Sequence, residues 1–419
     1  MSGRWTLRAA LLAAALLPAA AQTTGSAPER SLAIRPLAAP AGTGSALPQT
    51  TVSSRGILLS WVERRGPTAT LRFAERTASG WTTPRTAASG DDWFVNWADV
   101  PSVVRLSDGT IVAHWLQKTG SGTYAYDVRL AYSTDDGASW SPPFTPHGDG
   151  TEAEHGFASL FELPGRRLGL IWLDGRAMGS GASHGSGPDH AGAMTLRFTS
   201  FDRRWTQARE AVVDARVCEC CPTAVAVTSE GPVAAFRNRS DAEVRDIHVS
   251  RLQAGAWDEG RPLHRDNWRI AACPVNGPAL SANGRRVAAA WFTAAGDHGR
   301  AFVAFSGDAG RTFGTPIRLD DGTSLGRVDV EVLPDGAAAA TWIEFAGGRA
   351  QVLARRVTAE GERSPAVAIA RVDATRSSGY PRLARYGNEL LFAWTETPPG
   401  PGGHPHVRTA AARLPATPP

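Results

Sequence analysis

The sequence lacks two features that would place it among helical or membrane proteins. No long amphipathic pattern of helical period runs through its 419 residues, and no stretch beyond the first 21 residues is apolar for long enough to span a bilayer. The 44 glycines and 29 prolines instead suit a chain with many tight turns. These observations indicate an all-β class.

The sequence also lacks a strong excess of either charge, since the formal net charge is only +4 at pH 7. Such a balance argues against a dedicated nucleic-acid-binding protein, so no nucleic-acid partner is expected. Lysine is nearly absent, with Lys118 as its single occurrence, and arginine supplies the rest of the basic residues. We interpret this bias as genomic composition rather than as function.

The first 21 residues have the pattern of a secretory signal peptide. Arg4 and Arg8 supply positive charge, residues 9–17 form a short apolar core, and the small residues 19–21 suit a cleavage site. Residues 22–30 are mostly small and polar and are predicted to form a mobile leader. We therefore expect the mature chain to be exported, to the periplasm or outside the cell, without a transmembrane segment.

A phrase centred on one aromatic residue recurs seven times and determines the predicted architecture. The central residues are Trp61, Trp115, Trp172, Phe236, Trp291, Trp342 and Trp394. The intervals between them run from 51 to 64 residues. Strand-rich repeats of roughly 50 residues are typical of propeller blades. The sequence therefore predicts an all-β fold, a β-propeller of four-stranded blades, with seven blades preferred and six as the alternative.

The predicted propeller domain spans residues 31–412, and residues 413–419 form a tail. The last repeat, about 379–412, shows only three obvious strands, so residues 31–37 are expected to supply its outer strand. Such closure would remove the open sheet edges. Polar residues two positions beyond each core aromatic mark one face of the ring, the rim face: Glu63, Gln117, Asp174, Asn238, Thr293, Glu344 and Glu396.

Two predicted turns share a Ser-x-Asp-x-Gly pattern that ends on an aromatic residue. Their residues are Ser133, Asp135, Gly137 and Trp140 in the first, and Ser306, Asp308, Gly310 and Phe313 in the second. The aspartate is expected to accept local backbone hydrogen bonds, and the glycine to adopt a positive φ. The pattern resembles the Asp box, or BNR repeat, of the sialidase-like superfamily, which implies a structural role on the face opposite the rim face.

The resemblance to sialidases also implies a catalytic site. Family members use a Tyr–Glu pair as nucleophile and an Asp as acid/base, and Tyr380 resembles the late tyrosine of the family. Glu344 or Glu396 would then assist the tyrosine. The acid would be Asp91 or Asp92. The candidates for the three arginines that hold the substrate carboxylate are Arg176, Arg237 and Arg327.

The implied function is binding of an anionic glycan, such as a sialylated one, at the axial funnel, with exo-sialidase hydrolysis as its enzymatic form. The arginines are chosen by their position along the blades, because the family's early F/Y-R-I-P motif is absent from this sequence. A protein-binding scaffold is a further class, since propeller rims often bind protein partners.

Four cysteines form the most unusual local pattern. Cys218, Cys220 and Cys221 open the fourth repeat and Cys273 opens the fifth, so adjacent blades are expected to bring them together near the axis, with His155 from the third repeat. A disulfide staple would suit an oxidising compartment. Thiolates with an imidazole would suit Zn or Cu(I). A redox-active thiol pair is the third possibility.

The C-x-C-C-P and C-P-V-N-G-P segments also resemble those of a group of exported Asp-box propellers. Residues 176–192 add a Gly- and Ser-rich loop that holds His184 and His190 between Met178 and Met194. Methionine and histidine suit copper, whereas a hairpin tip would need no ligand. A non-hydrolytic propeller whose cysteines bind a metal, or form a staple, therefore stays open beside the glycan hypothesis.

Overall fold

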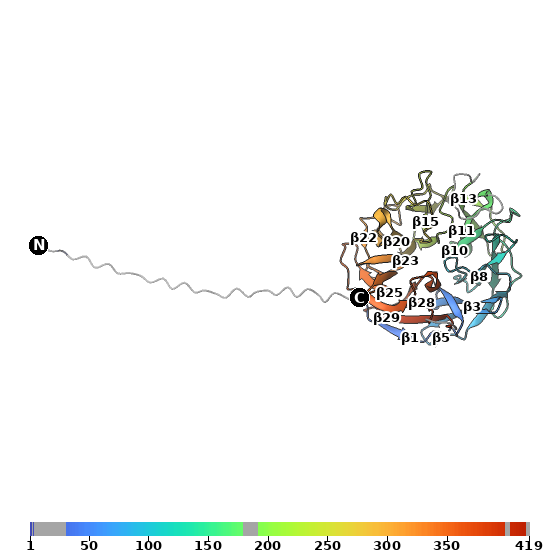
Figure 1. The fold of residues 1–419 in the computed structure, drawn as a ribbon, viewed down its shortest axis with the longest axis horizontal. Coiled ribbons are helices and arrows are strands. Elements are labelled where there is room, and N and C mark those ends of the chain that lie inside the picture. Colours follow the sequence, from blue (N-terminus) through green and yellow to red (C-terminus); the bar gives the residue numbers. More distant parts are fainter. Residues whose placement is uncertain (2, 4–30, 179–191, 399–402, 416–419) are drawn as a thin grey trace.

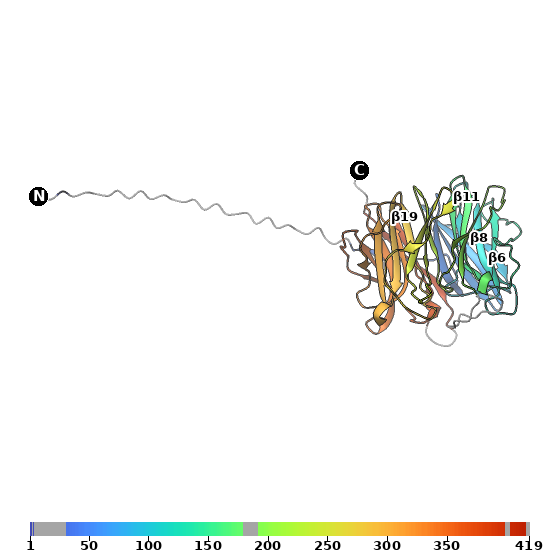
Figure 2. The same cartoon turned by 90° about the horizontal axis from the view of Figure 1, so that it is seen from above.

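The computed structural model of the chain describes residues 1, 3, 31–178, 192–398 and 403–415. Within them, seven antiparallel sheets stand around a central axis and close into a ring (Figures 1 and 2). Apart from residues 1 and 3, the predicted signal peptide and leader lie outside the described residues, as do His184 and His190. No helix in the described ranges has the length and apolarity that a bilayer crossing requires.

The blades follow one another in chain order. The first holds β2 (Ser45–Val52), β3 (Ile57–Arg65), β4 (Thr68–Thr77), β5 (Gly80–Trp81) and β6 (Arg85–Gly90). The second holds β7 (Ser102–Arg105), β8 (Ile111–Lys118) and β9 (Tyr126–Ser133). The third holds β10 (His155–Leu163), β11 (Arg167–Asp174), β12 (Thr195–Phe201) and β13 (Ala211–Asp214).

The fourth blade holds β14 (Ala224–Thr228), β15 (Gly231–Arg237), β16 (Ile247–Gln253), β17 (Ala256–Trp257) and β18 (Arg261–Pro262). The fifth holds β19 (Ala279–Asn283), β20 (Arg286–Thr293), β21 (Arg300–Ser306) and β22 (Ile317–Arg318). The sixth holds β23 (Thr323–Val332), β24 (Ala338–Ala346), β25 (Arg349–Val357) and β26 (Val367–Val372). The described residues also form three short 3-10 helices, η1 (Arg176–Met178), η2 (Ala295–Asp297) and η3 (Arg376–Ser378).

The seventh blade closes the ring with both ends of the domain. It holds β27 (Arg382–Tyr386), β28 (Glu389–Glu396), β29 (His406–Arg413) and β1 (Ile34–Leu37), and β1 pairs antiparallel with β29. The preferred seven-bladed fold is therefore confirmed, together with its N-terminal closing strand, and the six-bladed alternative is wrong. Pairing the first strand with the last removes the seam at which the ring would open.

The outer strand that a four-stranded second blade requires is reduced to one bridge, between Leu130 and Phe144. Pro142 and Pro143 precede Phe144, and proline has no N–H to donate to a ladder. The strand therefore cannot extend along β9.

The recurring aromatic residues are buried at the middle of each blade, on the second strand of the sheet. Indole nitrogens need a hydrogen-bond partner when buried, and the polar residue two positions on often supplies it. Trp61 donates to Glu63 at 2.9 Å, and Trp342 donates to Glu344 at 2.8 Å. The residue at the rim is thus polar partly because it accepts the hydrogen bond of the tryptophan two positions earlier.

The two Ser-x-Asp-x-Gly turns follow the third strands of their blades, β9 and β21. In the first turn, Ser139 N donates to Asp135 Oδ1 at 2.9 Å, and Gly137 N donates to Ser133 Oγ at 2.8 Å. Gly137 has a φ of 83°, which is the left-handed region that favours glycine. Trp140 packs the turn against the preceding blade, since its indole donates to O of Thr86 on β6 at 3.1 Å.

Candidate functional site

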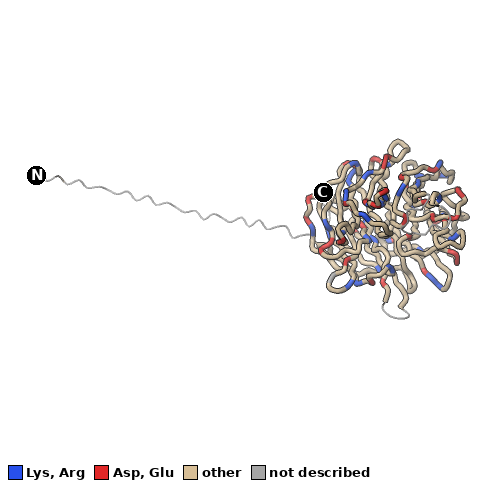
Figure 3. The backbone as a smooth tube through the Cα atoms, turned by 45° about the horizontal axis from the view of Figure 1, so that its top comes forward, with Lys and Arg blue, Asp and Glu red and all other residues tan. Residues whose placement is uncertain are grey.

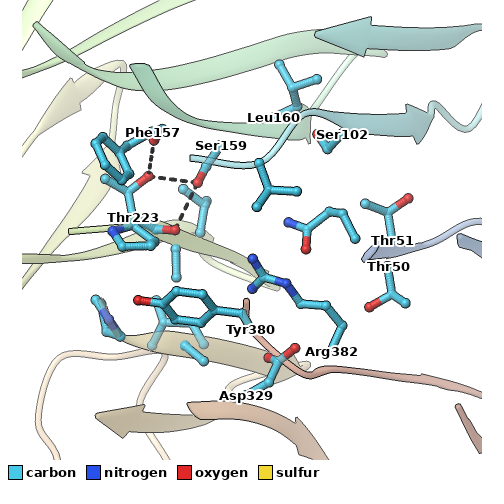
Figure 4. A pocket seen from close by; sticks show the side chains of 18 of the residues that line it. Thr50, Thr51, Ser102, Phe157, Ser159, Leu160, Thr223, Asp329, Tyr380 and Arg382 are labelled. Carbon is cyan, nitrogen blue, oxygen red and sulfur yellow. Dashed lines mark hydrogen bonds between the residues drawn. The ribbon is translucent and has the colours of Figure 1, made fainter. Parts of the chain in front are cut away.

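An axial pocket of about 200 Å³ lies where the innermost strands of the blades meet (Figure 4). Its wall takes residues from, or just before, the first strand of all seven blades: β2, β7, β10, β14, β19, β23 and β27. Pockets for drug-sized ligands measure about 300–1,000 Å³, so this one suits a single small unit, such as one sugar residue. Acidic and basic residues are otherwise interspersed around the ring (Figure 3).

Arg382 extends from β27 into the axial pocket (Figure 4). Its guanidinium carbon lies 5.2 Å from the centre of the Tyr380 ring, and its buried Nε has no hydrogen-bond partner among the described residues. Burial lowers the pKa of Arg382, while Asp329 and Tyr380 favour its charged form. Because an unpaired buried donor is costly, this guanidinium is available to an anionic ligand.

Tyr380 lies at the same pocket, as a residue that opens an inner strand should. Its hydroxyl donates to Val275 O at 2.8 Å, and its ring stacks on Trp97 with 5.9 Å between centroids. Burial raises the pKa of the Tyr380 hydroxyl above its usual range. The tyrosine is therefore a neutral, oriented group with one face toward Arg382.

Three carboxyl groups also line the axial pocket, namely Asp99, Asp329 and Glu331. Burial raises the pKa of Asp99 and that of Glu331 to about 8 each, and it also raises the pKa of Asp329. Asp99 accepts from Phe157 N at 2.8 Å, and Glu331 accepts from Ser281 Oγ at 2.7 Å. At neutral pH, Asp99 and Glu331 are mostly protonated. Asp329 is therefore the acid of this pocket that favours the charged form of Arg382.

The other polar side chains of the axial pocket carry hydroxyl or amide groups: Gln49, Thr50, Thr51, Ser102, Ser159 and Thr223. Ser159 Oγ and Thr223 Oγ1 lie 2.8 Å apart, across the boundary between the third and fourth blades. Such groups both donate and accept hydrogen bonds. The lining is thus suited to a hydroxyl-rich ligand.

Arg327 lies beside the axial pocket, next to Trp97. Its guanidinium carbon is 4.8 Å from the Trp97 ring centre, and its Nη1 donates to Thr375 O at 3.0 Å. The guanidinium of the exposed Arg376 lies 5.8 Å from the same ring. Two arginines and Tyr380 therefore surround the indole of Trp97. Sequence reasoning did not identify this cluster.

The other two predicted arginines have protein partners of their own. Arg237 is buried and donates to Arg245 O at 2.6 Å and to Phe292 O at 2.8 Å. Arg176 forms ion pairs with Asp174 at 2.6 Å and Asp149 at 2.9 Å. In the described structure, no contact joins Arg176, Arg237 and Arg327 at one point, so their shared role stays a prediction.

The predicted catalytic carboxylates likewise have local partners. Glu344 is buried and accepts from Trp342, Glu396 pairs with Arg408 at 2.7 Å, and Asp92 accepts from Gln117 Nε2 at 2.8 Å. The described contacts of Tyr380 include none of these three carboxylates. Their catalytic assignment stays a prediction.

The predicted cysteine cluster forms, with its thiols turned toward one another. The sulfurs of Cys218, Cys220 and Cys221 are buried within 4.8 Å of one another, and Cys273 packs against them. Cys218 Sγ lies 3.3 Å from Cys221 Sγ and 3.7 Å from Cys220 Sγ. These are contacts between free thiols, since a disulfide bond is about 2.05 Å long.

Arg245 gives the cysteine cluster its charge balance. Its Nη1 lies 3.3 Å from Cys218 Sγ and 3.0 Å from Glu219 Oε2. Burial opposes ionisation of Cys218, but hydrogen bonds from Cys220 and Cys221 and the charge of Arg245 outweigh it and hold the pKa of Cys218 well below its usual range. The cluster is therefore primed to present a thiolate.

His155 lies in a different cluster from the one predicted. It is fully buried, stacks on His147 at 3.9 Å between ring centroids, and faces Asp127, Asp149 and Asp174. No described contact joins it to a cysteine. Of the two methionines at the ends of the predicted copper loop, Met194 is buried in the apolar core and Met178 packs against that core.

Arg382 is the functional residue that sequence reasoning missed most clearly. Side chains two positions apart in an extended strand point to the same side, so a tyrosine assigned to the axis at 380 places Arg382 there as well. That signal was present in the sequence. No comparable signal marks Glu331 or Trp97, because their placement depends on how neighbouring blades pack.

These observations define a seven-bladed β-propeller with a small axial pocket, into which Arg382 extends with a buried Nε that has no hydrogen-bond partner among the described residues. No protein-family model and no curated protein matches the chain. The polysaccharide lyase Uly1 matches with a TM-score of 0.52 and 10% identity, over 90% of this chain and 91% of that one. A protein of unknown function from Dyadobacter fermentans matches with a TM-score of 0.50 and 16% identity, over 91% and 99%.

A variant of the NanB sialidase from Streptococcus pneumoniae matches with a TM-score of 0.45 and 9% identity, over 92% of this chain and 93% of that one. At these identities, the similarity to Uly1 and to the Dyadobacter protein establishes a shared fold and nothing finer.

Proposed function

We propose that this propeller binds an anionic glycan in its axial pocket. The observation that carries the proposal is Arg382, whose buried Nε has no hydrogen-bond partner among the described residues and whose guanidinium extends into the pocket. A sugar carboxylate or sulfate would supply the missing acceptor. Arginine matches the planar geometry of such groups with paired hydrogen bonds.

The rest of the pocket supports a saccharide rather than a bare ion. Hydroxyl and amide side chains surround Arg382, and the Tyr380 ring forms part of the wall. Asp99 and Glu331, with pKa values of about 8, would be mostly neutral beside the ligand. The fold-level likeness to Uly1, described as a polysaccharide lyase, is an analogy that agrees with this ligand class.

Exo-sialidase hydrolysis is the narrower form of the proposal. It assigns attack to Tyr380 assisted by Glu344 or Glu396, with Asp91 or Asp92 as the acid. It needs these groups within hydrogen-bond reach of the substrate or of Tyr380 during the reaction. Tyr380 instead donates to Val275 O in the described structure. We therefore propose binding as the function, with turnover as a possible extension of it.

The test compares charged and neutral sugars by isothermal titration calorimetry. N-acetylneuraminic acid and glucuronic acid are the charged probes, and lactose is the neutral one. We expect a charged sugar to bind and lactose not to bind, and Arg382→Gln to weaken binding at least about 10-fold, since hydrogen bonds to charged groups contribute about 1.5–3 kcal/mol. The matched control is Arg55→Gln, an exposed arginine paired with Asp136, which should bind as the parent does.

Equal binding of lactose, or unchanged binding by Arg382→Gln, would contradict the proposal. Release of the chromophore from a chromogenic sialoside, lost in Tyr380→Phe, would extend it to catalysis. Absence of turnover alongside charge-dependent binding would leave a non-hydrolytic glycan-binding propeller.

The cysteine cluster supports a second candidate function, the binding of Zn or Cu. Three buried sulfurs within 4.8 Å, a fourth cysteine against them and a thiolate favoured at Cys218 form a soft ligand set. The competing interpretation is a disulfide staple. Thiol titration with elemental analysis, on protein purified from its own compartment, separates the two: metal with reactive thiols after chelation supports the site, whereas unreactive cysteines without metal support the staple.

A further inference from the structure

Asp127, His147 and His155 converge between the second and third blades, away from both the axial pocket and the cysteines. Asp127 lies on β9, His155 is the first residue of β10, and His147 lies in the segment between these strands. Asp127 Oδ1 is 3.2 Å from His155 Nδ1 and 3.7 Å from His147 Nε2. The three atoms all lie within 4.8 Å of one another.

Two of these atoms are buried imidazole nitrogens with no hydrogen-bond partner in the described part of the chain, namely His147 Nε2 and His155 Nδ1. The two side chains are only 3% and 0% exposed. Buried polar atoms in proteins are nearly always satisfied, and leaving them without a partner costs free energy. Both orphan nitrogens face Asp127, so a single species among the three atoms would satisfy them together.

The opposite nitrogens of both rings face carboxylates. His155 Nε2 lies 3.2 Å from Asp149 Oδ2, and His147 Nδ1 lies 3.6 Å from the same oxygen. Histidines that bind metals usually present their second nitrogen to a carboxylate, which orients the ring and strengthens it as a ligand. Arg176 in turn pairs with Asp149 at 2.9 Å and so holds this outer carboxylate in place.

We infer that Asp127, His147 and His155 form a binding site for a divalent transition-metal ion, with zinc as the ion it takes. Zinc bonds to nitrogen and oxygen are about 2.0–2.2 Å long, so neighbouring ligand atoms of a tetrahedral site lie roughly 3.4 Å apart. The two observed separations, 3.2 and 3.7 Å, bracket that value. Three protein ligands leave one coordination position for water or a solute.

The two imidazole rings are stacked, so binding of a metal ion must change their relative orientation. Stacked imidazoles, here 3.9 Å apart and 10° from parallel, direct their lone pairs alongside one another rather than to one point. His147 lies outside any strand, so its ring can tilt, whereas His155 is fixed at the start of β10. Metal binding should therefore unstack the pair through His147.

The test uses the purified protein, stripped with a chelator and titrated with ZnCl₂ by calorimetry and with CoCl₂ by absorption. We expect a cobalt spectrum with a component from nitrogen and oxygen ligands, which is distinct from any thiolate charge-transfer band that the cysteine cluster contributes and is lost in His147→Gln. His147→Gln and Asp127→Asn should each weaken binding at least about 10-fold, and Asp149→Asn should weaken it by about 10–100-fold, as loss of an outer carboxylate does.

The matched control is His248→Gln, because His248 also has a ring nitrogen without a hydrogen-bond partner among the described residues but belongs to none of the ligand clusters found among them. It should leave zinc affinity unchanged. Far-ultraviolet circular dichroism verifies that each variant folds, and Asp127→Asn, which preserves shape, serves if His147→Gln does not fold.

Failure of the stripped protein to bind either ion would overturn the inference. So would zinc affinity that is equal in the parent and in Asp127→Asn. A cobalt spectrum that shows a thiolate band alone, and is the same in the parent and in His147→Gln, would assign the ion to the cysteines instead. None of these results depends on glycan binding, so the two proposals stand or fall separately.

Discussion

The cysteine cluster of the fourth blade and the acids of the axial pocket both bury ionisable groups, yet they compensate them differently. Around Cys218 the charges are paired, with Arg245 bonded to both the sulfur and Glu219. No described salt bridge reaches Asp99 or Glu331, and burial instead raises the pKa of each to about 8. Pairing keeps a charge in place but makes each partner essential, whereas protonation removes the charge and makes stability depend on pH.

The largest expected loss of stability follows from disrupting the charge pairing around Cys218. Arg245→Met would remove the cation beside Cys218 and leave Glu219 with Arg239 as its remaining partner. Removing one partner of a buried pair costs about 3–5 kcal/mol. We expect a loss of this size in the free energy of unfolding, measured by guanidinium denaturation. A loss under about 1 kcal/mol would show that the cluster does not depend on this pairing.

Arg55→Met is the control for that prediction. Arg55 pairs with Asp136 at 2.9 Å, but both side chains are about half exposed. Exposed ion pairs contribute about 0–1 kcal/mol, so this variant should unfold close to the parent.

A smaller loss of stability is expected at Gly156, which packs against Asp99 of the axial pocket. A methyl group at Gly156 would lie 2.9 Å from Tyr126 Cε2 and would also collide with Asp99 Oδ2. Gly156→Ala should therefore destabilise the protein by about 1–3 kcal/mol, the usual cost of overpacking. Thermal unfolding measures the loss, and Gly42→Ala, which meets nothing within 4 Å, should cause none of it.

The last effect accumulates with pH and sharpens the pH side of the comparison. Burial raises the pKa of Glu331 from 4.5 to about 8, so the folded state holds a proton that the unfolded chain releases above pH 4.5. The stability contributed by this proton is complete below pH 4.5 and is lost as pH rises to about 8. Glu331→Gln should remove this part of the decline, at most about 1.4 kcal/mol per pH unit.

Unfolding midpoints measured from pH 5 to pH 8 test the Glu331 prediction. The variant should lose less stability than the parent over this range. A decline of equal slope in both proteins would mean that Glu331 is ionised in the folded state at neutral pH.

The repeat architecture was predictable because it depends on local pattern. The aromatic phrases place one large buried side chain on the second strand of every blade, and residues 34–37 close the seventh blade as expected. Partner choice was not predictable in the same way. Glu344 was considered as a catalytic group, yet it accepts the indole N–H of Trp342 two positions earlier, a contact that strand geometry brings about.

The candidate sites differ in how much of each could be predicted from the sequence. Cys218, Cys220 and Cys221 lie within four residues, so their association was visible in the sequence, and Cys273 followed from the adjacency of blades. Asp127 and His147 instead meet His155 through a loop and two strands of neighbouring blades. No spacing rule relates positions 127, 147 and 155, so only the packed ring shows that they share one site.

By itself, the sequence determined the strand pattern, the number of blades and which residues could face the axis, because these follow from periodicities of about two residues within a strand and about fifty along the chain. The tertiary structure decided which side chains are in contact. It also decided which ionisable groups are ion-paired, which are protonated and which have no partner. Those outcomes depend on distances between segments that are remote in sequence. Electrostatic and hydrogen-bond energies change steeply over a few ångströms, which is finer than any sequence pattern resolves.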